Sequence, residues 1–169
     1  MHRLFLLRHA KAATHAPTAA GGDHDRPLAE VGLAVLGGVG RAVAKHLDGR
    51  PLDVVLCSTS ARTVETVAGI VAADPLVAAA EVRLDGRLYL AGPGRLRKRL
   101  AKLPAHVETA LVCGHNPGLH EFALELIGVD MAPPRLRYDL PTAGLVVVDL
   151  AGDWASIGTG TLRAFVPPS

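Results

Sequence analysis

The sequence predicts a three-layer α/β sandwich, in which helices cover both faces of a mostly parallel sheet with an antiparallel edge. Three observations favour this class. Short apolar runs alternate with longer segments in which apolar residues recur every three to four positions, as in strands followed by helices. The last two apolar runs flank a short turn, which is typical of a hairpin. The chain has 169 residues, of which 49% are hydrophobic, so we expect one sizeable core and a single domain over residues 1–169.

The first third of the chain predicts a strand, a loop and a helix. Leu4–Leu7 is a short apolar run that ends at Arg8 and His9, which is typical of a buried strand with polar groups at its carboxyl end. Residues 14–27 are rich in Ala, Gly, Asp, His and Pro without a sustained period, which indicates a surface loop. From Leu28 to Leu47 the apolar spacing predicts one helix despite its glycines.

The same order then repeats. Asp53–Cys57 is predicted as a second buried strand, and the hydroxyls of Ser58–Ser60 are suited to capping a helix that runs through Arg62, Thr66 and Ile70. The remaining predicted elements are a strand at 82–84, a helix at 93–102, a strand at 110–113, a helix at 119–127, and a hairpin of strands 145–150 and 154–165.

Polar residues follow three of the predicted strands. Arg8 and His9 follow the first, Ser58 and Arg62 the second, and His115 the third. Sheets of this kind bind ligands outside the carboxyl ends of their strands, so we expect these residues at one rim. Two arginine forks suit the oxygens of a dianionic group, which we expect to be phosphate. A neutral His9 has a ring nitrogen that can attack phosphorus, and His115 can donate a hydrogen bond to the transferring group.

Four ordered motifs resemble those of a known family, the histidine phosphatase superfamily, which includes the phosphoglycerate mutase relatives. They are Leu7-Arg8-His9-Ala10, Asp25-Arg26-Pro27-Leu28 followed by Gly32, Ser58 with Arg62 and Thr66 at four-residue spacing, and Gly114-His115-Asn116-Pro117. Their order and spacing are similar to those of the SixA branch, the phosphohistidine phosphatases. The resemblance extends from residue 4 to about 148 and implies a phosphoglycerate mutase-like fold.

The resemblance also implies roles for particular residues. His9 would be the phosphoacceptor, with Arg8, Arg62 and His115 around the phosphoryl group, and these four are the expected catalytic residues. Arg8, Arg26, Arg62 and His115 are the expected substrate-binding residues, with Arg26 as an extra arginine of the SixA-type site. The implied enzyme is a metal-independent phosphatase, a hydrolase that uses no cofactor.

The sequence departs from the wider family pattern at two places. Ala10 stands where the signature has glycine, which costs little if the backbone there is ordinary. Arg87 stands about where ester-cleaving members keep a glutamate, with Asp85 as the remaining candidate acid. An alkoxide needs a proton to leave, whereas a phosphorylated imidazole needs less help, so we expect a phosphohistidine protein as substrate. The alternatives are a small phosphorylated compound cleaved by a metabolite phosphomonoesterase, and a non-catalytic phosphate-binding module.

Charge and composition argue against several other functions. A net charge of +2 and few aromatic residues do not favour nucleic-acid binding, and the basic segment Arg95–Lys102 is expected to be a solvated helix face. The apolar run at the N-terminus is too short for a signal peptide or a membrane span, so we expect a cytoplasmic protein that does not bind membranes. Cys57 and Cys113 lack metal-site spacing and are expected to be reduced and packed. Nothing in the sequence sets the oligomeric state.

Overall fold

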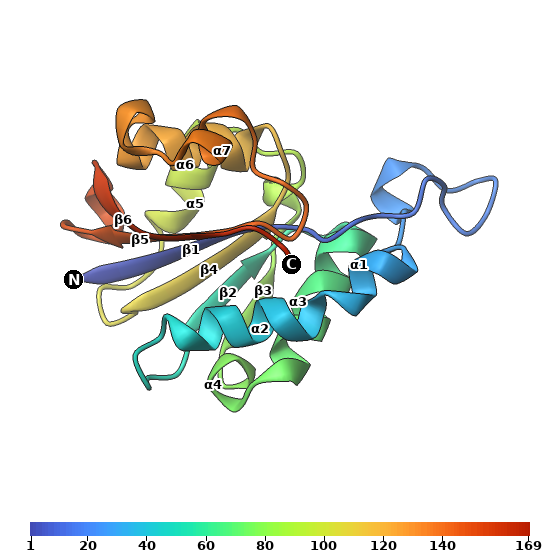
Figure 1. Ribbon diagram of the computed structural model, residues 1–169, viewed down its shortest axis with the longest axis horizontal. Coiled ribbons are helices and arrows are strands. Elements are labelled where there is room, and N and C mark those ends of the chain that lie inside the picture. The colour runs from blue at the N-terminus through green and yellow to red at the C-terminus, as the bar shows by residue number, and fades with distance from the viewer.

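The computed structural model describes all residues from 1 to 169 and contains one sheet of six strands (Figure 1). The strands are β1 (His2–Arg8), β2 (Val54–Cys57), β3 (Glu81–Leu84), β4 (Thr109–Gly114), β5 (Leu145–Leu150) and β6 (Gly160–Val166). They lie in the order β3-β2-β4-β1-β5-β6, with β1 to β4 parallel, β5 antiparallel to β1, and β6 antiparallel to β5. The predicted parallel sheet with an antiparallel edge is confirmed.

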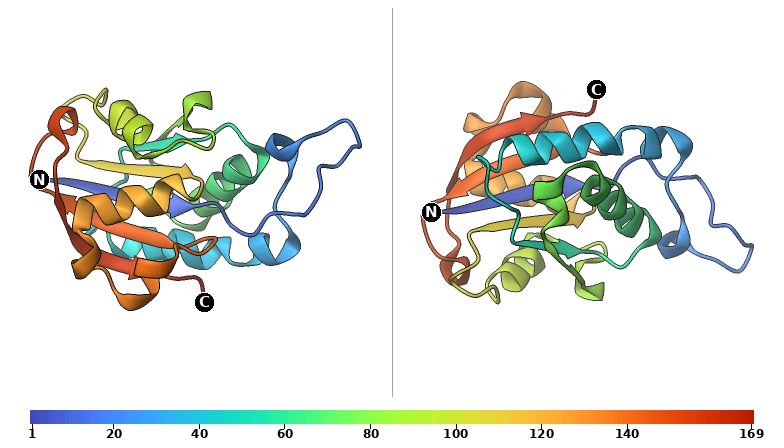
Figure 2. Two further views of the ribbon diagram at one scale, coloured as in Figure 1. Left: turned by 90° about the horizontal axis from the view of Figure 1, so that it is seen from above. Right: turned by 90° about the horizontal axis from the view of Figure 1, so that it is seen from below.

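Helices cover both faces of this sheet and complete the three layers. The α-helices are α1 (Glu30–Ala34), α2 (Leu36–Lys45), α3 (Ala61–Ala73), α4 (Pro75–Ala78), α5 (Pro93–Leu100), α6 (Gly118–Ile127) and α7 (Pro134–Tyr138). The 3-10 helices in the connections are η1 (Asp23–Asp25), η2 (Gly86–Leu88), η3 (Val129–Met131) and η4 (Trp154–Ser156). Helices α2, α3 and α4 lie on one face of the sheet, and α5, α6 and α7 lie on the other (Figure 1 and Figure 2).

Strand β1 shows why an unbroken apolar run forms a strand in this fold. Leu4 and Leu6 pack into the hydrophobic cluster beneath α5 and α6, whereas Phe5 and Leu7 pack into the cluster beneath α2 and α3. None of the four side chains is exposed to solvent. Successive strand residues point to opposite faces, so a strand covered on both sides needs apolar residues at every position.

The helix predicted over residues 28–47 is divided in the structure, so the prediction of one continuous helix is wrong. Helix α1 ends immediately before Val35, and α2 begins immediately after it. Leu28 lies outside both helices because its N–H donates to the Glu65 carboxylate over 2.6 Å and because it forms an isolated bridge with Ala12. These partners come from other parts of the chain, so the apolar spacing alone does not reveal them.

The terminal hairpin also differs from its predicted bounds. Its second strand begins at Gly160 rather than at Trp154, which starts the 3-10 helix η4 instead. The Trp154 indole N–H donates to the carbonyl of Val107 over 2.7 Å, and the ring is almost fully buried. Trp154 therefore closes one end of the hydrophobic cluster rather than extending the strand.

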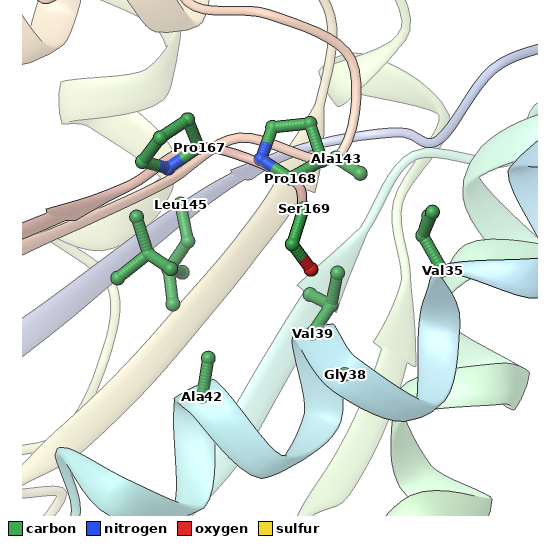
Figure 3. A pocket seen from close by; sticks show the side chains of 10 residues that line it. Val35, Gly38, Val39, Ala42, Ala143, Leu145, Pro167, Pro168 and Ser169 are labelled. Carbon is green, nitrogen blue, oxygen red and sulfur yellow. The ribbon is translucent and has the colours of Figure 1, made fainter.

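The C-terminal residues lie over helix α2 and beside Ala143, whose N–H donates to the carbonyls of Arg8 and His9. Figure 3 shows Val39 and Ala42 of α2, together with Val35 just before this helix, around the same cavity as Leu145 and the last three residues. The cavity between them holds about 50 Å³ and is mostly apolar. It therefore belongs to the packing between α2 and the sheet edge.

None of the helices combines the length and the hydrophobicity that are needed to span a lipid bilayer.

Candidate active site

The sheet register places the two predicted catalytic histidines side by side. Arg8 at the end of β1 pairs with Gly114 at the end of β4, and the His9 N–H donates to the Gly114 carbonyl over 3.2 Å. His9 and His115 thus follow adjacent parallel strands. Their ring centroids are 5.4 Å apart. The structure thus brings His9 and His115 together at the carboxyl ends of these strands, as the sequence predicts.

The environment of His9 defines which ring nitrogen is free. Its Nδ1 lies 2.7 Å from the carbonyl oxygen of Ala10. A carbonyl only accepts, so Nδ1 carries the proton and Nε2 keeps its lone pair. Burial, together with the positive charges of Arg62, Arg8 and Arg26, lowers the pKa of His9 to about 4, although the Ala10 hydrogen bond acts in the opposite direction. His9 is therefore neutral at pH 7, with an unprotonated Nε2.

Ala10 fits without strain where the family signature has glycine. Its φ is not positive, and its methyl group is buried in the cluster beneath α2 and α3. The Ala10 N–H donates to the Thr66 hydroxyl over 3.0 Å, and this hydroxyl donates to the Arg62 carbonyl over 2.7 Å. Thr66 thus ties the loop after β1 to helix α3, and this contact fixes His9 relative to Arg62.

His115 is held through both of its ring nitrogens. Its Nδ1 lies 3.3 Å from Nη2 of Arg62, and its Nε2 lies 2.8 Å from the Ser58 hydroxyl oxygen. A guanidinium only donates, so Nδ1 of His115 accepts and Nε2 carries the proton that is donated to Ser58. Burial, together with the charges of Arg62 and His9, lowers the pKa of His115 to about 3.

Ser58 does not cap helix α3, so this part of the sequence interpretation is wrong. The N-cap is Ser60, whose side chain accepts a hydrogen bond from the Thr63 N–H. Ser58 is fully buried and contacts His115 instead. Either serine can cap a helix by its residue type, but Ser60 directly precedes the first residue of α3 and Ser58 lies beside His115.

Arg62 and Arg26 share one carboxylate, which the sequence interpretation did not include in the site. Arg62 donates to the Asp23 carbonyl over 2.8 Å and to its carboxylate over 3.0 Å. Arg26 donates to the same carboxylate over 2.8 Å and 3.0 Å, and the Tyr89 hydroxyl also donates to it. The Tyr89 hydrogen bond, followed by those of the two arginines, holds the pKa of Asp23 well below its usual range.

The sequence gives little indication that Asp23 and Tyr89 belong to the site. Asp23 lies three residues before Arg26 in a loop without periodicity, and Tyr89 lies just after the segment in which an acid was sought. Asp23 is in the 3-10 helix η1 of the loop that projects from the carboxyl end of the sheet (Figure 2). The Tyr89 ring lies 5.3 Å from that of His115 and beside Arg62.

Two arginine N–H groups at this rim have no partner in the protein. Arg8 donates from Nη1 to the Leu140 carbonyl over 3.0 Å, but its Nε is buried without an acceptor. The Nε of Arg62 is likewise buried and unpaired, in a side chain that is only 3% exposed. Burial lowers the pKa of Arg8, and Arg62 adds to this effect. Buried donors of this kind are normally satisfied, and these two N–H groups have the charge and geometry that suit an anion's oxygens.

Both carboxylate oxygens of the candidate acid Asp85 are bound by groups other than the histidines. One of its carboxylate oxygens accepts from the Arg87 N–H over 2.9 Å, and the other accepts from Arg99 over 2.5 Å. Arg87 is exposed and lines a hollow beside α5. No group of three or more His, Cys, Asp or Glu side chains is arranged to hold a metal ion. Cys57 and Cys113 are free and buried.

Comparisons with known proteins agree with this geometry. A family model described as the histidine phosphatase superfamily, branch 1, matches residues 4–89. An uncharacterised protein of Mycobacterium tuberculosis is 36% identical over 160 residues, which cover 91% of this chain and 93% of that one. The chain belongs to the histidine phosphatase superfamily. Its phosphoglycerate mutase-like fold and its activity as a phosphatase, a hydrolase, follow from this membership.

Solved structures place this histidine phosphatase near the SixA branch. A candidate phosphohistidine phosphatase SixA from Nakamurella multipartitia is 31% identical, with a TM-score of 0.82 over 99% of this chain and 96% of that one. A similar SixA candidate from Agrobacterium tumefaciens is 30% identical, with a TM-score of 0.82 over 99% and 98% of the two chains. The resemblance to the SixA branch that the motifs predict is confirmed.

Proposed function

We propose that this phosphatase removes the phosphoryl group from phosphohistidine in a protein, through a covalent intermediate on His9. The observation that carries the proposal is the free Nε2 of a neutral His9, whose Nδ1 proton is held by the Ala10 carbonyl. This nitrogen lies in surroundings made positive by Arg8, Arg26 and Arg62. A neutral imidazole in such surroundings can attack the phosphorus of a dianion that the arginines bind.

In the first step, Nε2 of His9 attacks phosphorus and the bond from phosphorus to the substrate nitrogen breaks. The leaving nitrogen takes the bonding electron pair and, once its ring is protonated, departs as neutral imidazole. The unpaired Nε groups of Arg8 and Arg62 are suited to bind equatorial phosphoryl oxygens. The Ala10 carbonyl stabilises the positive charge that the phosphorylated His9 ring acquires, because it already accepts the Nδ1 proton.

In the second step, water attacks phosphorus and the bond to Nε2 of His9 breaks. Inorganic phosphate leaves with both protons of the water, and His9, which keeps its Nδ1 proton, returns to its neutral form. We assign His115 as a hydrogen-bond donor to the phosphoryl oxygens. In this role its Nε2–H donates to the substrate in place of the Ser58 hydroxyl oxygen. The charge of the transferring group is met by arginines and a histidine, so the mechanism calls for no metal.

The preference for phosphohistidine rests on the absence of a suitable acid. Asp85 is bound to Arg99, and Asp23 is held ionised by Tyr89 and two arginines. The pKa of Tyr89 is raised by burial and by Asp23, which accepts its proton. None of these groups can readily protonate an alkoxide. The names of the two SixA structures, both at least 30% identical, support the same substrate class.

Two further expectations of the sequence belong to this proposal. We propose that residues 1–169 act as one domain, because a single sheet separates the two hydrophobic clusters. A cytoplasmic location stays a prediction. The two buried free cysteines suit a reducing compartment.

The test is a panel of substrates combined with trapping of the intermediate. Quenched enzyme should carry acid-labile, base-stable phosphate. His9→Ala should abolish both label and turnover, whereas His106→Ala at an exposed position should keep both. Specificity constants should favour phosphohistidine or phosphoramidate over alkyl phosphates by at least about a hundredfold.

Three outcomes would contradict the proposal. Full activity of His9→Ala would exclude the covalent mechanism. Fastest cleavage of alkyl phosphates, lost in Asp85→Asn, would identify a metabolite phosphomonoesterase. Phosphate binding without turnover of any substrate would identify a non-catalytic module.

A further inference from the structure

A row of cations lies beside the candidate active site, on η2 and α5. Arg87, Arg95, Lys98, Arg99 and Lys102, which we call the basic face, line an open hollow of about 690 Å³. No acidic or apolar residue lines this hollow. Arg99 alone of the five has a carboxylate partner, Asp85. The basic face therefore holds four positive charges that nothing in the chain neutralises.

The cation of helix α5 that lies outside the basic face does have partners. Arg97 pairs with Glu125 of α6 over 3.4 Å, and its guanidinium lies over the Phe122 ring at 5.3 Å from the centroid. Arg95 and Lys98, on the exposed side, have no such partners. Like charges this close repel one another, so an anionic partner would relieve a cost that the free protein carries.

The basic face begins at the rim of the candidate active site. Arg87 lies two residues before Tyr89, whose ring is 5.3 Å from that of His115. A Cβ atom on Gly86 would lie 3.8 Å from the Thr59 hydroxyl oxygen, so η2 lies against the loop that carries Ser58. A segment bound along α5 would thus extend directly from a group held at His9.

Exposed leucines next to these cations favour a protein partner. Leu84 at the end of β3 is 59% exposed and lines an adjoining hollow with Arg83, Arg87 and Lys102. Leu90, two residues after η2, is 57% exposed and has a φ of 52°, a conformation that residues with a side chain rarely adopt. Apolar anchors within a charged surface are typical of protein interfaces, whereas nucleic-acid surfaces carry aromatic residues for stacking, which this face lacks.

We propose that the basic face binds an acidic segment of the phosphoprotein substrate and holds it while the phosphohistidine occupies the site. This inference rests on the proposed function and adds the chemical character of the substrate protein. Charges at the rim of an interface mainly change association and its salt dependence. The basic face should therefore lower KM for an acidic protein or peptide substrate and leave the rate of the chemical step unchanged.

The experiment uses two synthetic peptides that contain phosphohistidine. In one, a run of Asp and Glu follows the phosphohistidine, and in the other Asn and Gln replace these residues. The wild-type enzyme should prefer the acidic peptide by about tenfold in kcat/KM, through KM. The preference should disappear near 0.5 M salt, where the Debye length is roughly 4 Å.

A matched pair of variants locates the effect. Arg95→Gln with Lys98→Gln should reduce the preference to about twofold or less, without changing turnover of phosphoramidate. Arg41→Gln with Lys45→Gln removes the same two residue types from the exposed face of α2 and should keep the full preference. Equal loss in both double variants would overturn the proposal, because it would reflect net charge alone. So would equal rates on the two peptides.

A binding measurement separates this inference from the proposed function. Fluorescence anisotropy with the unphosphorylated peptides reports docking without chemistry, and the acidic peptide should bind more tightly in a way that depends on Arg95 and Lys98. If it does so while no phosphohistidine is hydrolysed, the proposed function fails and the docking surface stands. If both peptides are hydrolysed equally well, the docking surface fails and the function stands. Tighter binding of single-stranded RNA to the same residues would assign the face to nucleic acid and overturn the proposal.

Discussion

At the scale of single residues, the tautomers of His9 and His115 are the most direct consequence of the site geometry. The Ala10 carbonyl requires the proton of His9 on Nδ1, and Arg62 requires that of His115 on Nε2. Two neighbouring histidines thus present different faces: His9 offers a lone pair and His115 offers a proton. This difference suits His9 to the nucleophilic role and His115 to the donor role that we propose for them.

We expect nuclear magnetic resonance to detect these two tautomers and their low basicity. In long-range ¹H–¹⁵N spectra at pH 7, His9 should have a protonated Nδ1 and His115 a protonated Nε2. The pKa of His9 should be about 4, because burial disfavours its charged form, instead of the 6.5 of a free side chain. A His9 that titrates near 6.5 would contradict the buried neutral nucleophile.

Asp23 supplies a second prediction at this scale, because its carboxylate occupies donors that a phosphoryl group would use. Asp23→Asn removes the negative charge between Arg26 and Arg62. Inhibition by vanadate or phosphate should therefore become stronger, by roughly three- to tenfold, since an ion pair that is partly open to solvent contributes up to about 1 kcal/mol. Asp25→Asn, in the same 3-10 helix but without an arginine partner, should change inhibition little. Weaker inhibition of Asp23→Asn would mean that Asp23 positions the arginines rather than competes for them.

At the scale of elements, Gly118 controls how closely α6 approaches the segment before α5. A Cβ atom there would lie 1.7 Å from the Ala91 carbonyl oxygen, so no side chain fits without a backbone shift. Helix α6 follows the turn that carries His115, and Ala91 follows the segment that carries Tyr89. The glycine thus brings two parts of the site together by permitting contact between two backbones.

We expect Gly118→Ala to destabilise the protein by about 1–3 kcal/mol, as overpacked sites do, and to lower activity by moving His115. Gly94→Ala in α5 is the control. Nothing lies within 4 Å of its Cβ position, so the substitution should be neutral or stabilise by up to about 1 kcal/mol. Urea unfolding measures the change in stability. A stable and active Gly118→Ala variant would contradict the close backbone contact.

At the scale of the whole molecule, the buried neutral histidines make stability depend on pH. Folding lowers the pKa of His9 to about 4 and that of His115 to about 3, from about 6.5 in the unfolded chain. Between pH 6.5 and 4 the unfolded state therefore binds more protons than the folded state. By linkage, stability is complete above about pH 6.5 and is lost as the pH falls through this range.

Urea unfolding at pH 7, 6 and 5 tests this dependence. Each histidine should contribute a slope approaching about 1.4 kcal/mol per pH unit well below pH 6.5. A variant with His9→Gln and His115→Gln should show a clearly smaller slope over the same range, whereas His106→Gln should retain it. A wild-type protein as stable at pH 5 as at pH 7 would contradict the burial of neutral rings.

The sequence by itself determined the α/β class, the order of strands and helices, and the residues that meet at the rim. These features follow from local patterns. A strand covered on both faces needs an unbroken apolar run, as in Leu4–Leu7, and parallel strands bring the residues after their carboxyl ends together. His9 and His115 could therefore be placed side by side before any distance was known, and the four motifs indicated the family.

The tertiary structure alone decided how those residues are held. Asp23 joins Arg62 from 39 positions away, Ser58 joins His115 from 57 positions away, and Asp85 turns toward Arg99. The division of the predicted helix at Val35 has the same kind of origin. Periodicity reports which face of an element is buried, but it carries no information about which remote side chain supplies a partner. Hydrogen bonds and ion pairs depend on that partner, so the protonation states at this site follow from the fold as a whole.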